Sequence, residues 1–193
     1  LTVRKELEPT IPLVLLGCVT LPHLNQGDFR TDTARYAAVG LQAWRDGLFW
    51  VPHLQPDIPY FNKPPLVFWI HGFFLHLCGV HLWVTRIPSI LAAAGCVLLL
   101  VGIVRRFQGR VAAAGAGCIL ALTYEFFRRT REVSLDLWQL FFLLAALGIV
   151  AATCVRGKGT RMLWAGVPLG AALMCKPLVA LAFFPIIAVW LLW

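Results

Sequence analysis

The sequence predicts an all-α fold, a polytopic bundle of transmembrane helices. Of its 193 residues, 60% are hydrophobic and 13% are charged, whereas a soluble domain has about 45–50% apolar and about 25% charged residues. This composition excludes a disordered chain and an ordinary water-soluble fold. The charges are confined to the N-terminus, one long polar loop and several short junctions. Between them lie charge-free stretches, most of them near the length that crosses a bilayer: 9–27, 64–85, 87–104, 111–124, 137–155, 162–175 and 177–193.

The hydrophobic stretches are expected to be permanent parts of the protein. None carries the basic region and small-residue cleavage site of a removed signal peptide. The chain begins at Leu1 rather than at a methionine and ends within an apolar run at Trp193. We therefore expect it to be the N-terminal portion of a longer protein.

The net charge of +8, from 17 Lys and Arg against 9 Asp and Glu, does not predict nucleic-acid binding. The bases are scattered between apolar segments and form no stripe with interleaved aromatic residues. In membrane proteins such a surplus records orientation. The six cysteines mostly lie within apolar segments without a Cys-x-x-Cys pair, so they are interpreted as small buried hydrophobes rather than as a disulfide framework or a zinc site.

Orientation is predicted by two short basic junctions. Three arginines lie within 105–110, two arginines and one lysine lie within 156–161, and neither junction contains an acid. Both are expected to face the cytoplasm, where short loops carry an excess of Lys and Arg. Two crossings separate the junctions, so the turn 125–136 between those crossings is expected on the opposite, non-cytoplasmic side. After the second junction the chain crosses once more, so Lys176 is also expected on the non-cytoplasmic side.

The stretch 64–85 has two interpretations. It is long enough to span, but it contains His71, His76, His81 and two glycines, which weaken a span. If it crosses, the polar loop before it is cytoplasmic; if it lies along the interface, that loop is outside. We favour the interfacial placement. The expected organisation is one unit, 1–193, with spans near 9–27, 87–104, 111–127, 136–155, 162–175 and 177–193, and an outer loop, 28–85, with interfacial helices near 33–46 and 64–81.

The first half of the outer loop holds three candidate site residues. The segment 31–47 predicts a short amphipathic helix that begins near Asp32. Asp32 is interpreted as an N-cap, as a catalytic base, or as both. Arg35 and Tyr36, one turn later, are placed to anchor the helix at the headgroup level, which on spacing alone is the commoner role.

The second half of the outer loop is expected to be stiff. Prolines at 52, 56, 59, 64 and 65 fix φ repeatedly and push the residues before them, including Lys63, towards extended geometry. A residue that must meet a reacting atom gains from being held in advance. A snorkelling amine at the membrane edge is the alternative interpretation of Lys63.

The turn 124–138 carries the remaining candidates. Ionised groups are costly in the bilayer centre, so Arg131 and Asp136 are expected at the interface or beside a wet cavity. Asp136 opens a predicted crossing helix, where an acid is also favoured by the helix dipole alone.

Several of these segments together form a known pattern. An acid shortly before Arg-Tyr-Ala, then Pro-Tyr-Phe-x-Lys-Pro-Pro-Leu-x-x-Trp, then Arg-x-Pro-Ser resembles the polyprenyl-phosphate-dependent membrane glycosyltransferases, which include the aminoarabinose transferase of lipid A modification and the protein O-mannosyltransferases. The resemblance runs in order from about residue 28 to the end of the chain, over these segments: 32–37, 59–69, 86–89, 131–136 and 170–181.

The resemblance implies a multi-pass protein of the plasma (inner) membrane, with the active face non-cytoplasmic. It implies a sugar donor on a polyprenyl phosphate, a lipid, glycan or protein acceptor, contact with membrane lipids, and no nucleic acid. The reaction implied is transfer of a hexose or pentose with inversion. Asp32 would be the general base, and Asp136 would be a second acid that orients the acceptor or a basic partner. The donor phosphate would be bound by cations, with one phenol nearby: Lys63, Lys176, Arg35, Arg131 and Tyr36.

Three departures from the family pattern limit what it implies. Thr33 and Asn62 stand where the family commonly has acids, so two carboxylates that could bind a divalent cation are missing. We therefore expect no essential metal and no other cofactor, with a divalent cation as the open alternative. Pro177 replaces the glycine that follows the later motif lysine.

Two other functions stay open at the level of the sequence. One is a truncated or degenerate protein that binds the lipid carrier but does not catalyse transfer, which includes an inactive isolated chain of 193 residues. The other is a transporter subunit. Transporters place ionisable residues within crossings near the midplane, whereas nearly all those of this chain lie at segment ends.

Overall fold

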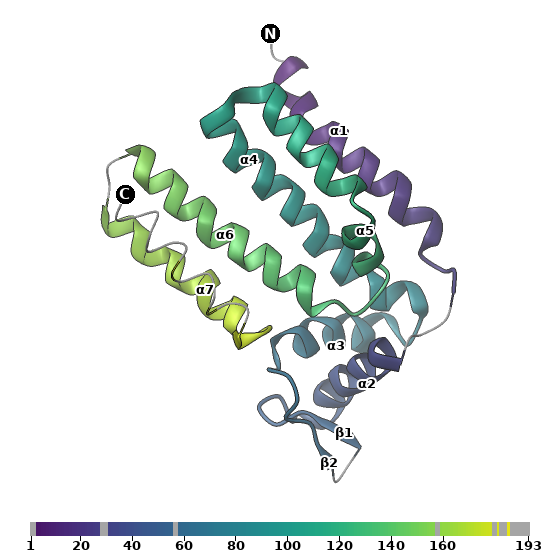
Figure 1. Ribbon diagram of the computed structural model, residues 1–193. Helices are drawn as coiled ribbons and strands as arrows, with labels where there is room; N and C mark the ends of the chain where they lie inside the picture. The colour runs from purple at the N-terminus through teal and green to yellow at the C-terminus, as the bar shows by residue number, and fades with distance from the viewer. Residues whose placement is uncertain are drawn as a thin grey trace.

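The computed structural model (Figure 1) describes residues 3–27, 31–55, 58–156 and 159–178, together with 181 and 185. The described part of the chain is mostly helical, which confirms the predicted all-α class. A short antiparallel hairpin is the exception, with His53 opposite Pro59. The elements are α1 Val3–Thr20, η1 Leu21–His23, α2 Thr31–Asp46, β1 His53–Gln55, β2 Ile58–Pro59, α3 Leu66–Cys78, α4 Leu82–Leu122, α5 Tyr124–Thr130, α6 Leu135–Arg156, η2 Gly159–Ala165 and α7 Gly166–Leu173.

Two layers make up the molecule. Helices α1, α4, α6 and α7 run side by side as a bundle, and α2, α3 and the hairpin lie across one end of it (Figure 1). The main core of the bundle is apolar, with Leu16 from α1, Val97 and Val101 from α4, and Leu137 from α6. A second core joins the outer layer to the bundle through Val67 and neighbouring side chains of α2, α3 and α6.

Helix α4 consists of two antiparallel arms. The chain reverses at Gly109, whose φ of 82° lies in the left-handed region that glycine adopts most readily. Gly117 allows close packing of the arms, because a Cβ there would lie 2.7 Å from the Val101 Cγ2 atom. The sequence predicts crossings at 87–104 and 111–127; the second arm instead ends at Leu122, and α5 follows.

Two segments of the described chain are long and apolar enough to cross a membrane: the whole of α4, which contains the reversal, and Leu135–Thr153 within α6. The predicted spans 9–27 and 162–175 correspond to shorter apolar helices, Pro9–His23 and Met162–Leu173. The predicted span 177–193 lies largely outside the described residues. The set of crossings, and the interfacial placement of α2 and α3, stay predictions.

The basic junctions lie at the end of the bundle opposite the outer layer. The reversal of α4 and the end of α6 at Arg156 are both at the top in Figure 1, whereas α2 and α3 are at the bottom. The reversal is tied to α6, because Arg106 Nη1 donates to the Gly148 carbonyl at 3.1 Å. The two junctions that the sequence assigns to one side of the membrane therefore share one end of the bundle.

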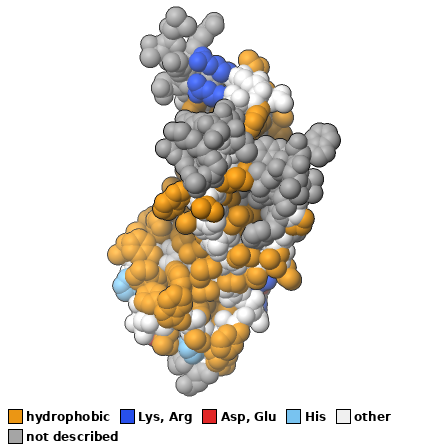
Figure 2. All heavy atoms as spheres, turned by 90° about the vertical axis from the view of Figure 1, so that its left-hand side faces the viewer, with side chains coloured by type: hydrophobic (Ala, Val, Ile, Leu, Met, Phe, Trp, Pro, Cys, Tyr) orange, Lys and Arg blue, Asp and Glu red, His pale blue; other side chains and the backbone are white. Residues whose placement is uncertain are grey.

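The lateral surface is strongly apolar. On the α7 side, hydrophobic side chains cover much of the visible face, and Lys or Arg side chains lie at its upper end (Figure 2). Leu163, Trp164 and Val167 of η2 and α7 are 66–81% exposed. A face of this kind suits contact with lipid or other helices rather than with water.

The outer layer depends on a backbone contact between α2 and α3. A Cβ on Gly72 would lie 2.1 Å from the Gly40 carbonyl oxygen, and a Cβ on Gly40 would lie 2.6 Å from the Phe68 carbonyl oxygen. Trp44 Nε1 donates to the Trp69 carbonyl at 2.8 Å, so an indole fixes the same crossing. The layer is therefore packed at a distance that only glycine permits.

We predict that Gly72→Ala destabilises the protein by about 1–3 kcal/mol, because the added methyl overlaps backbone that cannot move aside. The apparent melting temperature in detergent should fall accordingly. Gly102→Ala is the matched control, since nothing lies within 4 Å of a Cβ at that helical glycine, and it should leave the melting temperature unchanged or raise it slightly. Equal melting temperatures for Gly72→Ala and Gly102→Ala would show that the close contact between α2 and α3 does not contribute to the stability of the protein.

Candidate functional site

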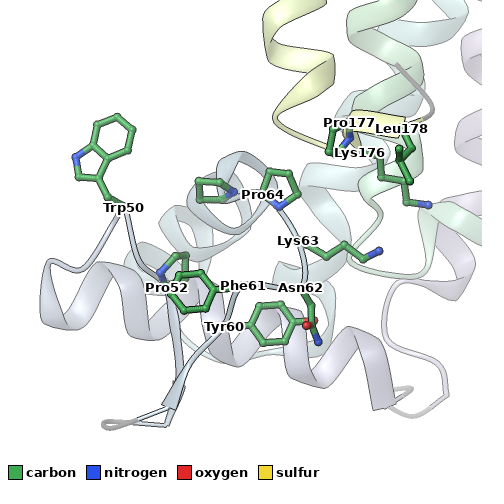
Figure 3. Close-up of a pocket in the computed structure, with 11 residues that line it drawn as sticks. Trp50, Pro52, Tyr60, Phe61, Asn62, Lys63, Pro64, Lys176, Pro177 and Leu178 are labelled. Atoms are coloured by element: carbon green, nitrogen blue, oxygen red, sulfur yellow. The ribbon is translucent and has the colours of Figure 1, made fainter. Parts of the chain in front are cut away.

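A cavity of about 620 Å³ opens where the outer layer meets the end of α7 (Figure 3). It combines aromatic and proline side chains with two lysines. Figure 3 shows that the Lys63 and Lys176 side chains extend in the same direction from different walls. The lining residues are Trp50, Pro52, Tyr60, Phe61, Asn62, Lys63, Pro64, Pro65, Lys176, Pro177 and Leu178.

Lys63 lies on the segment between β2 and α3. Tyr60 holds this segment, since its N–H donates to the Pro52 carbonyl at 2.7 Å and its ring meets that of Phe68 in an edge contact at 5.7 Å. Two prolines then follow Lys63 and lead into α3, where their fixed φ limits the backbone. The lysine is therefore presented from a restrained loop.

Lys176 follows α7 and is bound by α6. Its ammonium contacts Asp136 Oδ1, and its backbone carbonyl accepts a 2.7 Å hydrogen bond from Gln139 Nε2. The other carboxylate oxygen of Asp136 pairs with Arg129 Nη1 at 3.0 Å. Both oxygens of Asp136 thus face cations, an arrangement that fixes the Lys176 side chain in place.

Arg129 extends this pairing into α5. Its Nε donates to Glu125 Oε1 at 2.9 Å, and its Nη1 lies 3.6 Å from Glu132 Oε2. Arg128 also reaches Glu132, at 3.0 Å. The cations of the outer turn are largely balanced by acids of the same turn.

Asp32 and Arg35 form a separate pair on α2. Arg35 Nη1 lies 3.3 Å from Asp32 Oδ1, and the two side chains are 39% and 71% exposed for Arg35 and Asp32 respectively. Neither lines the cavity. The arginine contacts one carboxylate oxygen, and the exposed carboxylate remains open to an approaching group.

Tyr36 lies behind the cavity wall. Its ring is 6.5 Å from Tyr60 and 5.6 Å from Phe68, centroid to centroid. Burial, together with Tyr60 and Asp32, raises the pKa of Tyr36, so the phenol stays protonated at neutral pH. Its observed contacts support Tyr60.

Arg131 contacts residues outside the cavity. Its Nη2 donates to the Gln26 carbonyl at 3.4 Å, and its guanidinium lies 6.0 Å from the centre of the Phe127 ring. It is not a lining residue. Of the five predicted phosphate-binding residues, the structure thus brings Lys63 and Lys176 into the cavity and leaves Arg35, Tyr36 and Arg131 outside its lining.

Within the described ranges, no group of three or more His, Cys, Asp or Glu side chains is arranged to hold a metal ion. His71, a conspicuous polar residue of the predicted interfacial helix, is fully buried and faces the Thr85 carbonyl through Nδ1 at 3.1 Å. Burial lowers the pKa of His71 to about 3. The ring is therefore neutral and belongs to the packing of α3 on α4.

Two residues that the sequence motifs do not indicate, Arg129 and Gln139, hold Asp136 and Lys176. Gln139 lies three residues after Asp136 on the same helix, a spacing that places both on one face. That spacing was an available signal for Gln139. The pairing of Arg129 across the α5–α6 turn has no such local signature.

The chain also matches known proteins. Residues 62–193 match the family described as dolichyl-phosphate-mannose-protein mannosyltransferase. The chain belongs to this family. The match covers more than half of the chain and confirms the resemblance to polyprenyl-phosphate-dependent glycosyltransferases.

Family relatives extend the similarity to the outer loop and α1. The chain is 28% identical over 183 residues to YycA of Bacillus subtilis, covering 94% of this chain and 27% of that protein. It is 29% identical over 192 residues to the undecaprenyl phosphate-alpha-4-amino-4-deoxy-L-arabinose arabinosyl transferase of Pectobacterium carotovorum, covering 95% of this chain and 34% of that protein. The chain therefore spans about a quarter to a third of the length of these relatives.

The fold of the family is the same in a solved relative. ArnT from Cupriavidus metallidurans in the apo state superimposes with a TM-score of 0.80 at 21% identity, over 99% of this chain and 36% of that one. The structure of the same protein bound to undecaprenyl phosphate gives a TM-score of 0.77 at 21% identity, over 94% of this chain and 34% of that one.

Proposed function

We propose that this chain forms the donor-binding part of a membrane glycosyltransferase that moves a sugar from a polyprenyl phosphate to an acceptor. One observation carries the proposal: Lys63 and Lys176, from segments far apart in the sequence, line one cavity. Family membership and the binding of undecaprenyl phosphate by the solved relative support the same donor class.

The lysines suit the chemistry of the leaving group. As the bond between the anomeric carbon and the phosphate oxygen breaks, negative charge grows on the carrier phosphate. Fixed cations in a partly enclosed site stabilise that charge. Lys63 is restrained by its loop, and Lys176 by Asp136 and Gln139. In this mechanism Asp136 positions Lys176, and Tyr36 supports the wall through Tyr60.

Asp32 is the proposed general base. The acceptor hydroxyl or amine attacks the anomeric carbon, its proton passes to the Asp32 carboxylate, and the polyprenyl phosphate leaves, with inversion and without a covalent sugar intermediate. Arg35 contacts the carboxylate from the same helix. The exposure of Asp32 leaves room for an acceptor to approach it. Arg131 supports the loop before α2 through Gln26 and is not assigned to the phosphate.

The site is proposed to lie on the non-cytoplasmic face of the plasma membrane. The cavity is at the end of the bundle opposite the basic junctions (Figure 1), and such junctions mark the cytoplasmic side. A carrier anchored by its prenyl chain would present its phosphate at that outer interface.

A carrier-binding protein that does not catalyse transfer is the second candidate. It is favoured by one observation, that Asp32 lies outside the lining of the lysine cavity. The two candidates share phosphate binding and differ in the role of Asp32.

We predict that Lys63→Ala raises the Kd for undecaprenyl phosphate about 10- to 100-fold, which corresponds to losing one charge-assisted hydrogen bond of about 1.5–3 kcal/mol. Titration of the purified protein in detergent, followed by tryptophan fluorescence, measures it. Arg45→Ala removes an exposed cation on α2 outside the cavity and should not change the Kd. Equal Kd values for both variants and the wild type would remove Lys63 from the phosphate site.

We predict that Asp32→Asn lowers sugar transfer by about 10²–10⁴-fold, as expected for loss of a general base, with unchanged undecaprenyl phosphate binding and melting temperature. Asp46→Asn, on the same helix and bonded to Gln42 one turn earlier, is the control and should retain transfer. Full transfer by Asp32→Asn would exclude this base.

We predict that, in an otherwise cysteine-free protein, Gln55→Cys reacts with a membrane-impermeant maleimide in intact cells. Gln108→Cys, at the α4 reversal, should react only after lysis, because the two exposed positions lie at opposite ends of the bundle. Labelling of Gln108→Cys alone in intact cells would reverse the proposed orientation.

A further inference from the structure

The Arg-x-Pro-Ser motif, 86–89, has no role in the proposed chemistry, yet it makes a dense set of long-range contacts. Arg86 is 3% exposed and Ser89 is fully buried at the start of α4. Three residues apart on a helix, they share one face. Their partners lie on two other segments, the end of η1 and the turn before α6.

Among the described residues, the hydrogen-bond partners of Arg86 are backbone carbonyls. Its Nη1 donates to the carbonyls of His23 and of Leu24, the latter at 2.8 Å. Its Nε donates to the Arg131 carbonyl at 3.2 Å. A buried guanidinium needs acceptors for its N–H groups. These carbonyls belong to the start of the outer loop and to the outer turn, so Arg86 joins the two segments.

Ser89 holds the next residues of the same turn. Its Oγ donates to the Glu132 carbonyl at 2.6 Å and accepts from the Ser134 N–H at 3.1 Å. Ser134 Oγ then accepts the Leu137 N–H at 3.2 Å, which fixes the first turn of α6. One hydroxyl therefore restrains both sides of the turn that precedes Asp136.

We propose that Arg86 and Ser89 are positioning residues for the phosphate site, and this rests on the proposed function. They fix the backbone 131–134, which places Asp136 on α6. Asp136 in turn holds Lys176 at the cavity through its carboxylate. The motif thus sets the location of a cation that lies on another helix and that it does not touch.

Ser89→Ala is the sharpest test, because a variant of buried Arg86 is liable to misfold. In the intact protein, Ser89→Ala should speed hydrogen exchange of the Ser134 and Leu137 amides about two- to tenfold, as expected for losing a hydrogen bond of ordinary strength. It should also raise the Kd for undecaprenyl phosphate about two- to tenfold. Thr153→Ala removes a buried hydroxyl whose partners in the described part of the chain, the Ile149 and Val150 carbonyls, lie near the opposite end of α6. This variant should change neither the exchange of the Ser134 and Leu137 amides nor the Kd.

A double-mutant cycle with Lys176→Ala separates positioning from general destabilisation. If Ser89 acts through Lys176, Ser89→Ala should not weaken undecaprenyl phosphate binding further in the Lys176→Ala background. In the protein that retains Lys176, Ser89→Thr keeps a hydroxyl at this position and should bind like the wild type. Equal weakening in both backgrounds, or unchanged exchange at Ser134, would overturn the positioning role.

The same experiment distinguishes the two proposals. Failure of the wild-type protein to bind undecaprenyl phosphate would overturn the proposed function, and with it the positioning of a phosphate site, while the exchange measurement would still report whether Ser89 restrains the turn. Tight wild-type binding with no effect of Ser89→Ala would overturn only the positioning role.

Discussion

The ion pair between Asp136 and Lys176 is the interaction on which the geometry of the site depends. It joins the first turn of α6 to the residue that follows α7, and Gln139 adds a bond to the Lys176 backbone from the same helix. Because Arg129 occupies the second carboxylate oxygen, Asp136 is held from two sides. A lysine that would otherwise lie on a short connection between helices is thereby fixed beside the loop that carries Lys63.

The ion pair between Asp136 and Lys176 also neutralises charge at the site. A lysine already neutralised by a carboxylate costs less to keep at a partly buried site than an isolated ammonium. In the proposed function, a bound phosphate would give Lys176 a second anionic neighbour while Asp136 keeps its contact with Arg129. The acids and arginines of α5 provide further compensation nearby, so a change of charge at the cavity is met by groups that are already ordered.

The sequence predicts the helical class, the amphipathic α2 and the family with good accuracy, because these depend on composition, periodicity and short motifs. It does not predict the hairpin at His53, where closely spaced prolines gave no clear strand pattern. It also groups Arg35 and Arg131 with the cavity lysines, whereas neither lines the cavity in the structure. Arg35 contacts Asp32 within its own helix, and Arg131 donates to the carbonyl of Gln26, a residue far away in the sequence. Such choices depend on side-chain direction and on contacts between distant segments, which spacing along one chain does not encode.

The glycine contact between α2 and α3 has a consequence for how this architecture diversifies. With backbone against backbone at Gly40 and Gly72, and with Trp44 bonded across the same crossing, a larger side chain at either glycine would force α2 and α3 apart. The connection between these two helices carries three residues of the cavity lining, Trp50, Phe61 and Lys63. Its side chains can therefore be exchanged, and the cavity reshaped, without altering the glycine contact that supports it.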